Sequence, residues 1–152
     1  MKRINLLYVI TVAMILTSAC GSSTPVVTPT PAAAQITAAA NGTEVDVNLG
    51  DNTIKSSQTE FKAGVPYTFV VVNSGQHAHN FNIAPPVSVA GSLDAALSSA
   101  LLSVTRDKLQ SGKSVTVEYT FPDSAVGQKL EFSCLIPKHY EDGMLLTITV
   151  TK

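Results

Sequence analysis

The sequence has 152 residues, with 10 lysines and arginines against 11 aspartates and glutamates, and a net charge of −1. Few of its residues can donate sulfur or nitrogen to a metal. There are only two cysteines, three histidines and three methionines, so their positions in the sequence are informative. The basic residues form no cluster, which excludes the electrostatic footprint of a nucleic-acid-binding protein and a polybasic patch for anionic lipid.

The first residues have the three parts of a secretory signal. Lys2 and Arg3 precede an apolar run over residues 4–16, and small residues then lead to Cys20. The apolar run is too short to span a bilayer comfortably as a permanent helix. Thr17-Ser18-Ala19-Cys20 resembles the end of a bacterial lipoprotein signal, in which the cysteine becomes the lipidated first residue. An uncleaved membrane anchor and ordinary secretion are the alternatives, and all three export the chain.

We therefore predict a signal peptide over residues 1–19, lipidation at Cys20 and a position on the outer, periplasmic or extracytoplasmic face of the cell membrane. The stretch "GSSTPVVTPTPAAAQ" is uncharged and rich in Ser, Thr, Pro and Ala, which predicts a semi-extended tether over residues 20–40. Residues 41–152 are enough for one folded core. Once Cys20 carries lipid, Cys134 has no disulfide partner in an oxidising compartment, so it needs burial or a metal.

The folded part consists mainly of predicted strands. Most of them alternate apolar and polar residues, whereas "PYTFVVVN" is continuously apolar, as in a strand buried on both faces. Leu97, Leu101 and Val104 recur at helical spacing after a possible cap at Ser92, which predicts a short surface helix. We expect an all-β sandwich or partly closed barrel with one short helical insertion. The predicted strands lie in "TEVDVNLGD", "PYTFVVVN", "HNFNIA", "VTVEYTF", "KLEFSC" and "MLLTITVTK".

The alternation within these strands predicts where four scarce side chains point. In "KLEFSC", Cys134 shares the inward face with its apolar neighbours, while Lys129, Glu131 and Ser133 face outward. Met144 shares the inward face of the last strand, His139 lies on the loop between the two strands, and "HNFNIA" carries His79 on its apolar face. Without a bulge, these four residues converge at one end of the sandwich.

Two imidazoles and a thiolate in one plane, with a weak axial thioether, form the ligand set of a blue-copper electron-transfer site. Zinc also binds Cys and His, although thioether is a poor zinc ligand. A thiolate–imidazolium pair of Cys134 and His139, oriented by Glu141 or Asp142, is a further alternative. His77 replaces His79 if the strand is shifted by two residues.

Two stretches, "FVVVNSGQHAHNFNI" and "FSCLIPKHYEDGM", resemble the cupredoxins, the family of plastocyanin, azurin and auracyanin. The spacing Cys-x4-His-x4-Met is nearest that of the auracyanins. The resemblance implies a Greek-key β-sandwich or barrel with one type 1 (blue) copper ion. It assigns the metal to His79, Cys134, His139 and an axial Met144, and gives Asn80 a hydrogen bond across to the cysteine loop.

The resemblance also implies a role as a one-electron carrier between membrane redox complexes. Such a protein meets its redox partners transiently, transforms no small-molecule substrate, is not an enzyme and works as a monomer. A cupredoxin-fold lipoprotein for copper storage or delivery is the alternative. Ala78 and Lys138 stand where many members of the family have Gly, and the charge of Lys138 beside His139 is expected to disfavour Cu(II). An apolar rim around His139 is expected from Ala84, Pro85, Pro86, Ile136 and Pro137.

Overall fold

The structure is a computed structural model, and it describes residues 42–152. The predicted signal peptide (1–19), the lipidation site Cys20 and the tether (20–40) lie outside the described residues. Within residues 42–152, no helix has both the length and the apolar character needed to cross a membrane.

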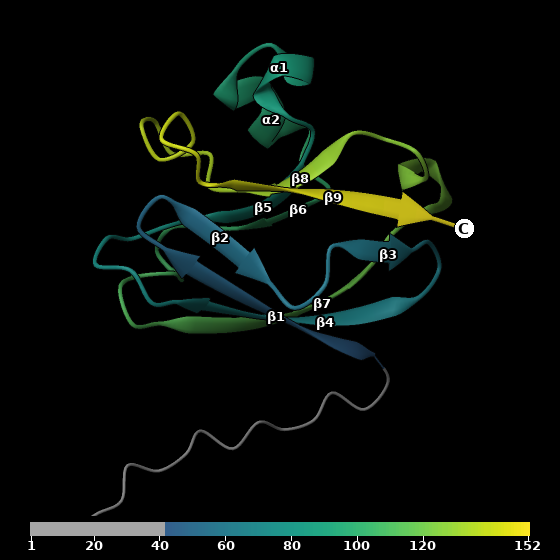
Figure 1. The fold of residues 1–152 in the computed structure, drawn as a ribbon, viewed down its shortest axis with the longest axis horizontal. Coiled ribbons are helices and arrows are strands. Elements are labelled where there is room, and N and C mark those ends of the chain that lie inside the picture. The colour runs from purple at the N-terminus through teal and green to yellow at the C-terminus, as the bar shows by residue number, and fades with distance from the viewer. Residues whose placement is uncertain (1–41) are drawn as a thin grey trace, which may run out of the picture. The chain divides into compact units, whose positions relative to one another are not determined.

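The described residues form two β-sheets packed face to face, with the helices on the outer side of one sheet (Figure 1). Two strand pairs are parallel, residues 43–49 with 67–73 and residues 60–62 with 149–151, and the remaining neighbours are antiparallel. The first sheet has the order β2 (Thr53–Ser56), β1 (Thr43–Gly50), β4 (Pro66–Asn73) and β7 (Ser114–Thr120). The second has the order β3 (Glu60–Lys62), β9 (Leu145–Thr151), β8 (Leu130–Ser133), β5 (Phe81–Ala84) and β6 (Leu102–Val104).

A cluster of aromatic rings fills the core between the sheets. The ring centroid of Phe61, on β3, is 5.0 Å from that of Phe121, 5.1 Å from Tyr67, and 5.7 Å from both Phe69 and Phe132. All four phenylalanines are at most 1% exposed. Each fully buried ring contributes roughly 1.5–3 kcal/mol by leaving water. Burial of these rings explains why apolar and polar residues alternate along the predicted strands, and it fixes the register of the strands.

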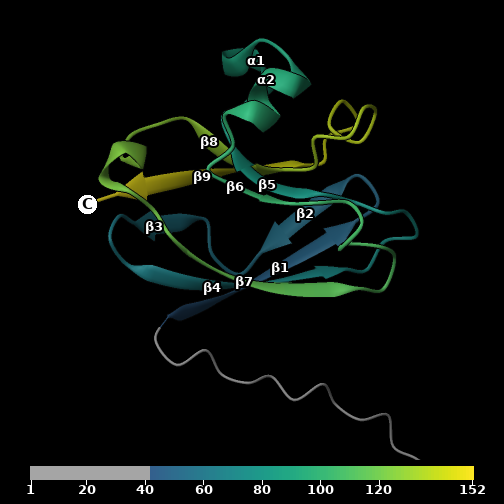
Figure 2. The ribbon, with the colours of Figure 1, turned by 180° about the vertical axis from the view of Figure 1, so that it is seen from behind.

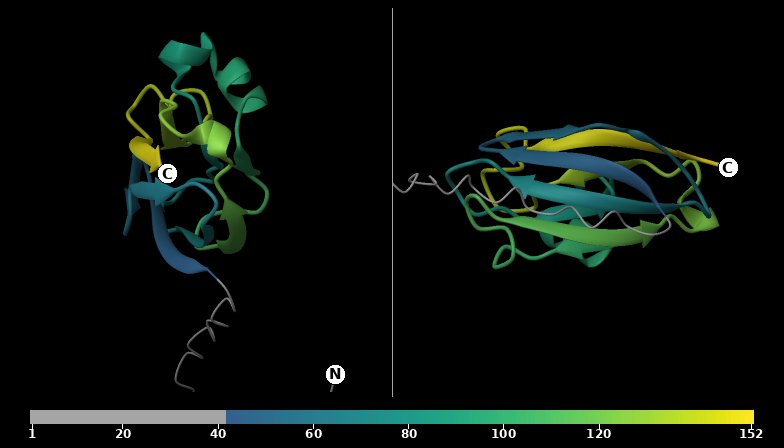
Figure 3. Two further views of the ribbon diagram at one scale, coloured as in Figure 1. Left: turned by 90° about the vertical axis from the view of Figure 1, so that its right-hand side faces the viewer. Right: turned by 90° about the horizontal axis from the view of Figure 1, so that it is seen from below.

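The two sheets differ in what covers their outer faces, and this corrects the expectation for one strand. "PYTFVVVN" was expected to be buried on both faces, but Val72 of β4 is 36% exposed, since no described element covers the first sheet (Figure 3). The outward direction expected for Glu131 and Ser133 of β8 does not bring them into solvent, because both are buried, at 3% and 0% exposure. Two short helices lie on the outer side of this second sheet (Figure 2), and Glu131 interacts with Tyr140, whose hydroxyl accepts a hydrogen bond from the Val87 N–H at 3.0 Å.

The helical insertion contains two short helices, α1 (Val87–Ala90) and α2 (Leu93–Ser98). The cap expected at Ser92 is present, because its hydroxyl accepts a hydrogen bond from the Ala95 N–H at 3.1 Å. The expected continuation of the helix through Leu101 and Val104 is wrong. Val104 instead belongs to β6, where it pairs with β5, and this strand pairing prevails over the helical spacing. A 3-10 helix, η1 (Asp123–Ala125), follows β7.

Candidate metal centre

Three side chains from two distant segments meet at one end of the sandwich. The ligand atoms of His79, Cys134 and His139 all lie within 4.8 Å of one another. The two Nδ1 atoms are 3.0 Å apart, and the sulfur of Cys134 is 3.8 Å from Nδ1 of His79 and 3.6 Å from Nδ1 of His139. The structure therefore brings together three of the four residues predicted as metal ligands around one small space.

Strand ends and short loops place these residues. The loop between β4 and β5 carries His79, and the loop between β8 and β9 carries His139; Figures 1 and 2 both place these two loops at the same end of the sandwich. Cys134 directly follows β8 and Met144 directly precedes β9. The Cys134 N–H donates to the Met144 carbonyl at 3.0 Å, and the Met144 N–H donates to the His139 carbonyl at 2.9 Å. The backbone of the β8–β9 loop is thus tied together at its ends.

The centre is buried except on one side. His79, Cys134 and Met144 are each 0% exposed, whereas His139 is half-buried. The inward direction predicted for Cys134 and Met144 agrees with this burial. Met144 thus lies in the interior beside Cys134, and its role as an axial ligand stays a prediction. His139 is the member of the group that reaches toward the surface.

The hydrogen bond expected from Asn80 to the cysteine loop is present. The side-chain oxygen of Asn80 accepts from the Leu135 N–H at 2.8 Å and from the side-chain amide of Asn82 at 2.9 Å. Leu135 follows Cys134, and Asn80 follows His79. One amide group therefore links the two segments that supply the donor atoms, which limits how far those segments can move apart.

Burial shifts the pKa of two donors, Cys134 and His79. It raises the pKa of the Cys134 thiol, and hydrogen bonds from the N–H groups of Asn80 and Ile136 to the sulfur offset this in part. Burial, followed by the neighbouring His139, lowers the pKa of His79. Neutral imidazole is the form that binds metals, so His79 is ready for a metal without losing a proton. A cation is needed to stabilise the buried thiolate.

The dimensions of the cluster fit a single metal ion. A triangle with sides of 3.0, 3.6 and 3.8 Å has its centre roughly 2 Å from each corner, close to a metal–imidazole bond of about 2.0–2.1 Å. Two nitrogens and one sulfur are donors for Cu or Zn rather than for Mg or Ca, which prefer oxygen. The residues present therefore fit a transition-metal ion.

The structure also places three neighbours of the cluster that the sequence singled out. The side chain of His77 is 70% exposed and lies outside the cluster, so His79 occupies the position for which the two histidines competed. Ala84 is fully buried and cannot belong to an exposed apolar rim. Lys138 has a φ of 72°. That left-handed conformation favours Gly, which explains why Gly suits this position in the family that the motif resembles.

One residue near the site, Asp51, was not predicted from the sequence. Oδ1 of Asp51, in the turn between β1 and β2, lies 3.3 Å from Nε2 of His79. The backbone N–H groups of Gln76 and His77 hydrogen-bond to this carboxylate, and the bond from Gln76 contributes most to holding the pKa of Asp51 well below its usual range. Nothing in a Gly-Asp-Asn turn signals a partner 28 residues further along the chain.

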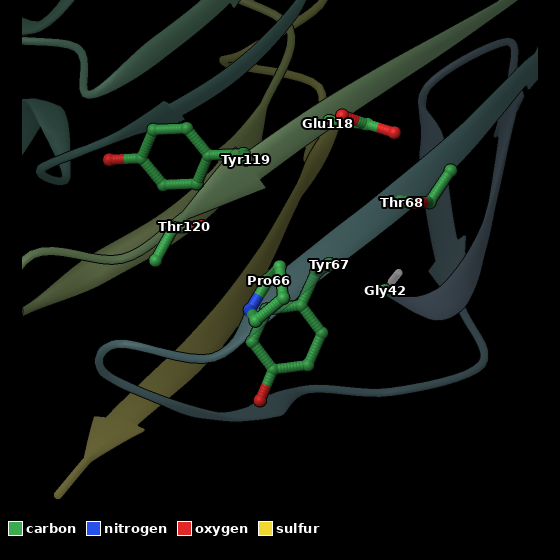
Figure 4. Close-up of a pocket in the computed structure, with 7 residues that line it drawn as sticks. All are labelled: Gly42, Pro66, Tyr67, Thr68, Glu118, Tyr119 and Thr120. Carbon is green, nitrogen blue, oxygen red and sulfur yellow. The ribbon is translucent and has the colours of Figure 1, made fainter. Parts of the chain in front are cut away.

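A pocket elsewhere in the domain has no part in this centre. It lies at the first residues of β4 and the last residues of β7, whereas the loop of His79 follows the opposite end of β4. Figure 4 shows its lining residues, which are Gly42, Pro66, Tyr67, Thr68, Glu118, Tyr119 and Thr120.

Known proteins resemble the chain at a distance. No family model matches the sequence. The copper-resistant cuproprotein CopI of Pseudomonas aeruginosa is 26% identical in an alignment that covers 70% of this chain and 75% of that protein. The dithionite-reduced auracyanin of the photosynthetic bacterium Roseiflexus castenholzii is 22% identical with a TM-score of 0.57, over 74% of this chain and 99% of that one.

Two further solved structures are similar to the chain in fold. Auracyanin B is 23% identical with a TM-score of 0.58, over 74% of this chain and 91% of that one. The azurin Az-iso2 of the methylotroph Methylomonas sp. strain J is 17% identical with a TM-score of 0.52, over 72% and 98%. These similarities confirm the predicted all-β fold of cupredoxin type.

Proposed function

We propose that this protein is an exported, membrane-tethered type 1 (blue) copper protein that carries single electrons between membrane redox complexes. The observation that carries the proposal is the triangle of two imidazole nitrogens and one thiol sulfur, together with the buried Met144, whose backbone carbonyl is hydrogen-bonded to the Cys134 N–H. That donor set, with a thioether as the weak fourth ligand, is the one used by blue-copper electron-transfer sites.

The residues around the triangle favour copper over zinc. Cys134 and Met144 supply soft sulfur donors, which suit Cu(I), while the imidazoles of His79 and His139 suit both oxidation states. Bound copper supplies one-electron redox chemistry. The chain's own contribution is to hold the donors still: the donors lie at strand ends, and Asn80 joins their segments by a hydrogen bond to the Leu135 N–H. A site that barely rearranges on oxidation keeps electron transfer fast.

The exposure of the site supports a carrier rather than an enzyme. His79 and Cys134 are fully buried, so a substrate has no direct access to them, whereas the half-buried His139 offers a route for an electron to the surface. Pro137 beside it is exposed, and Ile136 and Pro86 are half-buried. We propose that a redox partner docks transiently on this apolar surface, and that the copper protein acts as a monomer.

Export and tethering rest on the first part of the sequence. Residues 1–19 have the charge and apolar pattern of a signal peptide, Cys20 follows as the lipidation site, and residues 20–40 have the composition of a tether. We propose that lipid on Cys20 holds the copper domain, residues 41–152, at the outer face of the cell membrane. This anchor keeps the domain near membrane redox complexes.

A second function, copper storage or delivery, is favoured by the relative CopI, whose name describes a copper-resistant cuproprotein. Repeated oxidation and reduction of the copper-loaded full chain in the presence of a copper-free acceptor protein separates the two functions. A carrier keeps its copper through many cycles and transfers electrons rapidly to a redox partner. Rapid transfer of the metal to the acceptor, with slow electron transfer, would favour delivery and overturn the carrier proposal.

A further inference from the structure

The carboxylate of Asp51 faces the side of the His79 ring that points away from the other metal-site donors. Nδ1 of His79 lies 3.0 Å from Nδ1 of His139, inside the cluster, whereas Nε2 lies 3.3 Å from Oδ1 of Asp51. His79 is 0% exposed, while the Asp51 side chain is 36% exposed. The ring therefore connects the buried centre to a carboxylate at the surface of the domain.

The loop that carries His79 fixes this carboxylate in place. The Gln76 N–H donates to both oxygens of Asp51, at 3.1 and 3.0 Å, and the His77 N–H donates to Oδ1 at 3.2 Å. Nδ1 of His77 also lies 3.1 Å from Oδ1. Asp51 thus comes from the β1–β2 turn but is anchored to the chain two and three residues before His79, so its position relative to the ring is well defined.

Gly75 shows that the chain leaves room for this contact. A Cβ atom at this position would lie 2.5 Å from Oδ1 of Asp51 and 2.9 Å from Nε2 of His79, closer than real Cβ atoms come to such neighbours. The Gly75 N–H is itself held by the side-chain oxygen of Asn73 at 2.9 Å and the Leu49 carbonyl at 3.2 Å. Any larger residue in this buried place must displace the carboxylate, the ring or the backbone between them, and so disturb their contact.

We propose that Asp51 is a positioning residue for the metal ligand His79: its carboxylate accepts the Nε2–H of the ring and thereby keeps the lone pair of Nδ1 aimed at Cys134 and His139. A carboxylate behind a metal-bound imidazole fixes the tautomer and makes the nitrogen a stronger donor. The stronger donor favours Cu(II) over Cu(I), so Asp51 lowers the reduction potential. The part that concerns copper rests on the proposed function, whereas the tautomer does not.

The first test needs no metal. Nitrogen-15 NMR of the metal-free full chain at neutral pH reports which ring nitrogen of His79 carries the proton. We expect the Nε2–H tautomer to dominate in the native protein and in Asp51→Asn, whose amide oxygen still accepts the hydrogen bond. In Asp51→Ala the tautomer ratio should fall at least about tenfold, the effect of losing a hydrogen bond to a charged group. An unchanged ratio in Asp51→Ala overturns the proposal.

Gly75→Ala and Asp142→Asn complete the metal-free test. Gly75→Ala leaves Asp51 intact but displaces its carboxylate, so it should shift the tautomer in the same direction as Asp51→Ala. If either variant unfolds, the other still decides the question. Asp142, exposed in the β8–β9 loop, is the control for loss of one acidic group near the site, and Asp142→Asn should leave the tautomer unchanged. If Asp142→Asn shifts the His79 tautomer ratio as much as Asp51→Ala does, the proposal is also overturned.

The second test uses copper. In Asp51→Ala the affinity for Cu(II) should fall about 10–100-fold, the affinity for Cu(I) should fall less, and the reduction potential should rise. Asp51→Asn should also raise the potential, because it removes the charge, while Asp142→Asn should change it much less. If Asp51→Ala and Asp51→Asn have the same reduction potential as Asp142→Asn and the native chain, the claim that Asp51 lowers the potential is overturned. Failure of the native chain to form a blue site overturns the proposed function but leaves the NMR result standing.

Discussion

At the scale of single residues, burial and contacts distinguish the histidine that belongs to the metal centre from the one that does not. His79 is fully buried and touches both other donors of the triangle, whereas the side chain of His77 is 70% exposed and only approaches His139, with ring centroids 6.3 Å apart. We therefore expect His77→Ala to keep the colour and the copper of the native protein, and His79→Ala to lose both. Absorption spectra and metal analysis of the two purified variants check this. Loss of copper in His77→Ala would contradict the assignment of the ligand.

Met144 is the residue predicted as the fourth, axial ligand, and its substitution tests that prediction. Its side chain is completely buried, and its backbone carbonyl accepts a hydrogen bond from the Cys134 N–H at 3.0 Å. Axial ligation tunes the potential of a blue-copper site while the trigonal plane produces the colour. Met144→Leu, which conserves volume, should keep the colour and raise the reduction potential, as measured by protein-film voltammetry. An unchanged potential would argue against axial ligation, and a lost colour would indicate that Met144 is a principal ligand.

At the scale of elements, the helical insertion is joined to the β8–β9 loop through Tyr140. The Tyr140 hydroxyl accepts a hydrogen bond from the Val87 N–H of α1 at 3.0 Å and interacts with Glu131 on β8. Ala84, Ala96 and Leu135 form a small apolar cluster in the same region. The insertion therefore covers the outer face of the second sheet and braces the loop that carries His139.

Glu131 makes this packing sensitive to pH. Burial raises its pKa above the ordinary 4.5, and the hydrogen bond from Tyr140 opposes this only in part. The folded state then binds more protons than the unfolded state between pH 4.5 and the raised value, so the free energy of unfolding falls as pH rises through that window. Glu131→Gln should remove this decline, and it should stabilise the metal-free protein more at pH 7 than at pH 4.

Urea unfolding of the metal-free protein at several pH values measures this difference. Glu118→Gln is the matched control, because Glu118 is an exposed acid on β7. Its substitution should leave the pH profile of the native chain unchanged. A Glu131→Gln profile parallel to that of the native chain would show that burial of Glu131 does not control stability in this range.

For the whole molecule, much of the site was predictable and its surroundings were not. Cys134 and Met144 are scarce residue types on apolar strand faces, so alternation alone indicated that both point inward. Asp51 could not be found in this way, because its contact with His79 depends on how the β1–β2 turn meets the loop after β4. The helix end was missed because Leu101 and Val104 fit a helical spacing, whereas Val104 pairs with Phe81 of β5 in the structure.

The outer faces of the sheets show the same limit. Alternation placed Glu131 opposite the core, which is correct, but it carries no information on whether another layer covers that face. Glu131 is 3% exposed in the sheet whose outer side carries the two short helices, while Val72 in the other sheet is 36% exposed. Local pattern thus predicts the direction of a side chain, and only the arrangement of layers determines its exposure.

The visible spectrum of the full chain loaded with Cu(II), recorded beside that of Cys134→Ala, tests the central claim most directly. Thiolate-to-copper charge transfer should give the native protein an intense blue colour, and Cys134→Ala should be colourless even where copper still binds. A colourless native copper complex, or the same spectrum in both proteins, would contradict a blue-copper centre built on Cys134, His79 and His139.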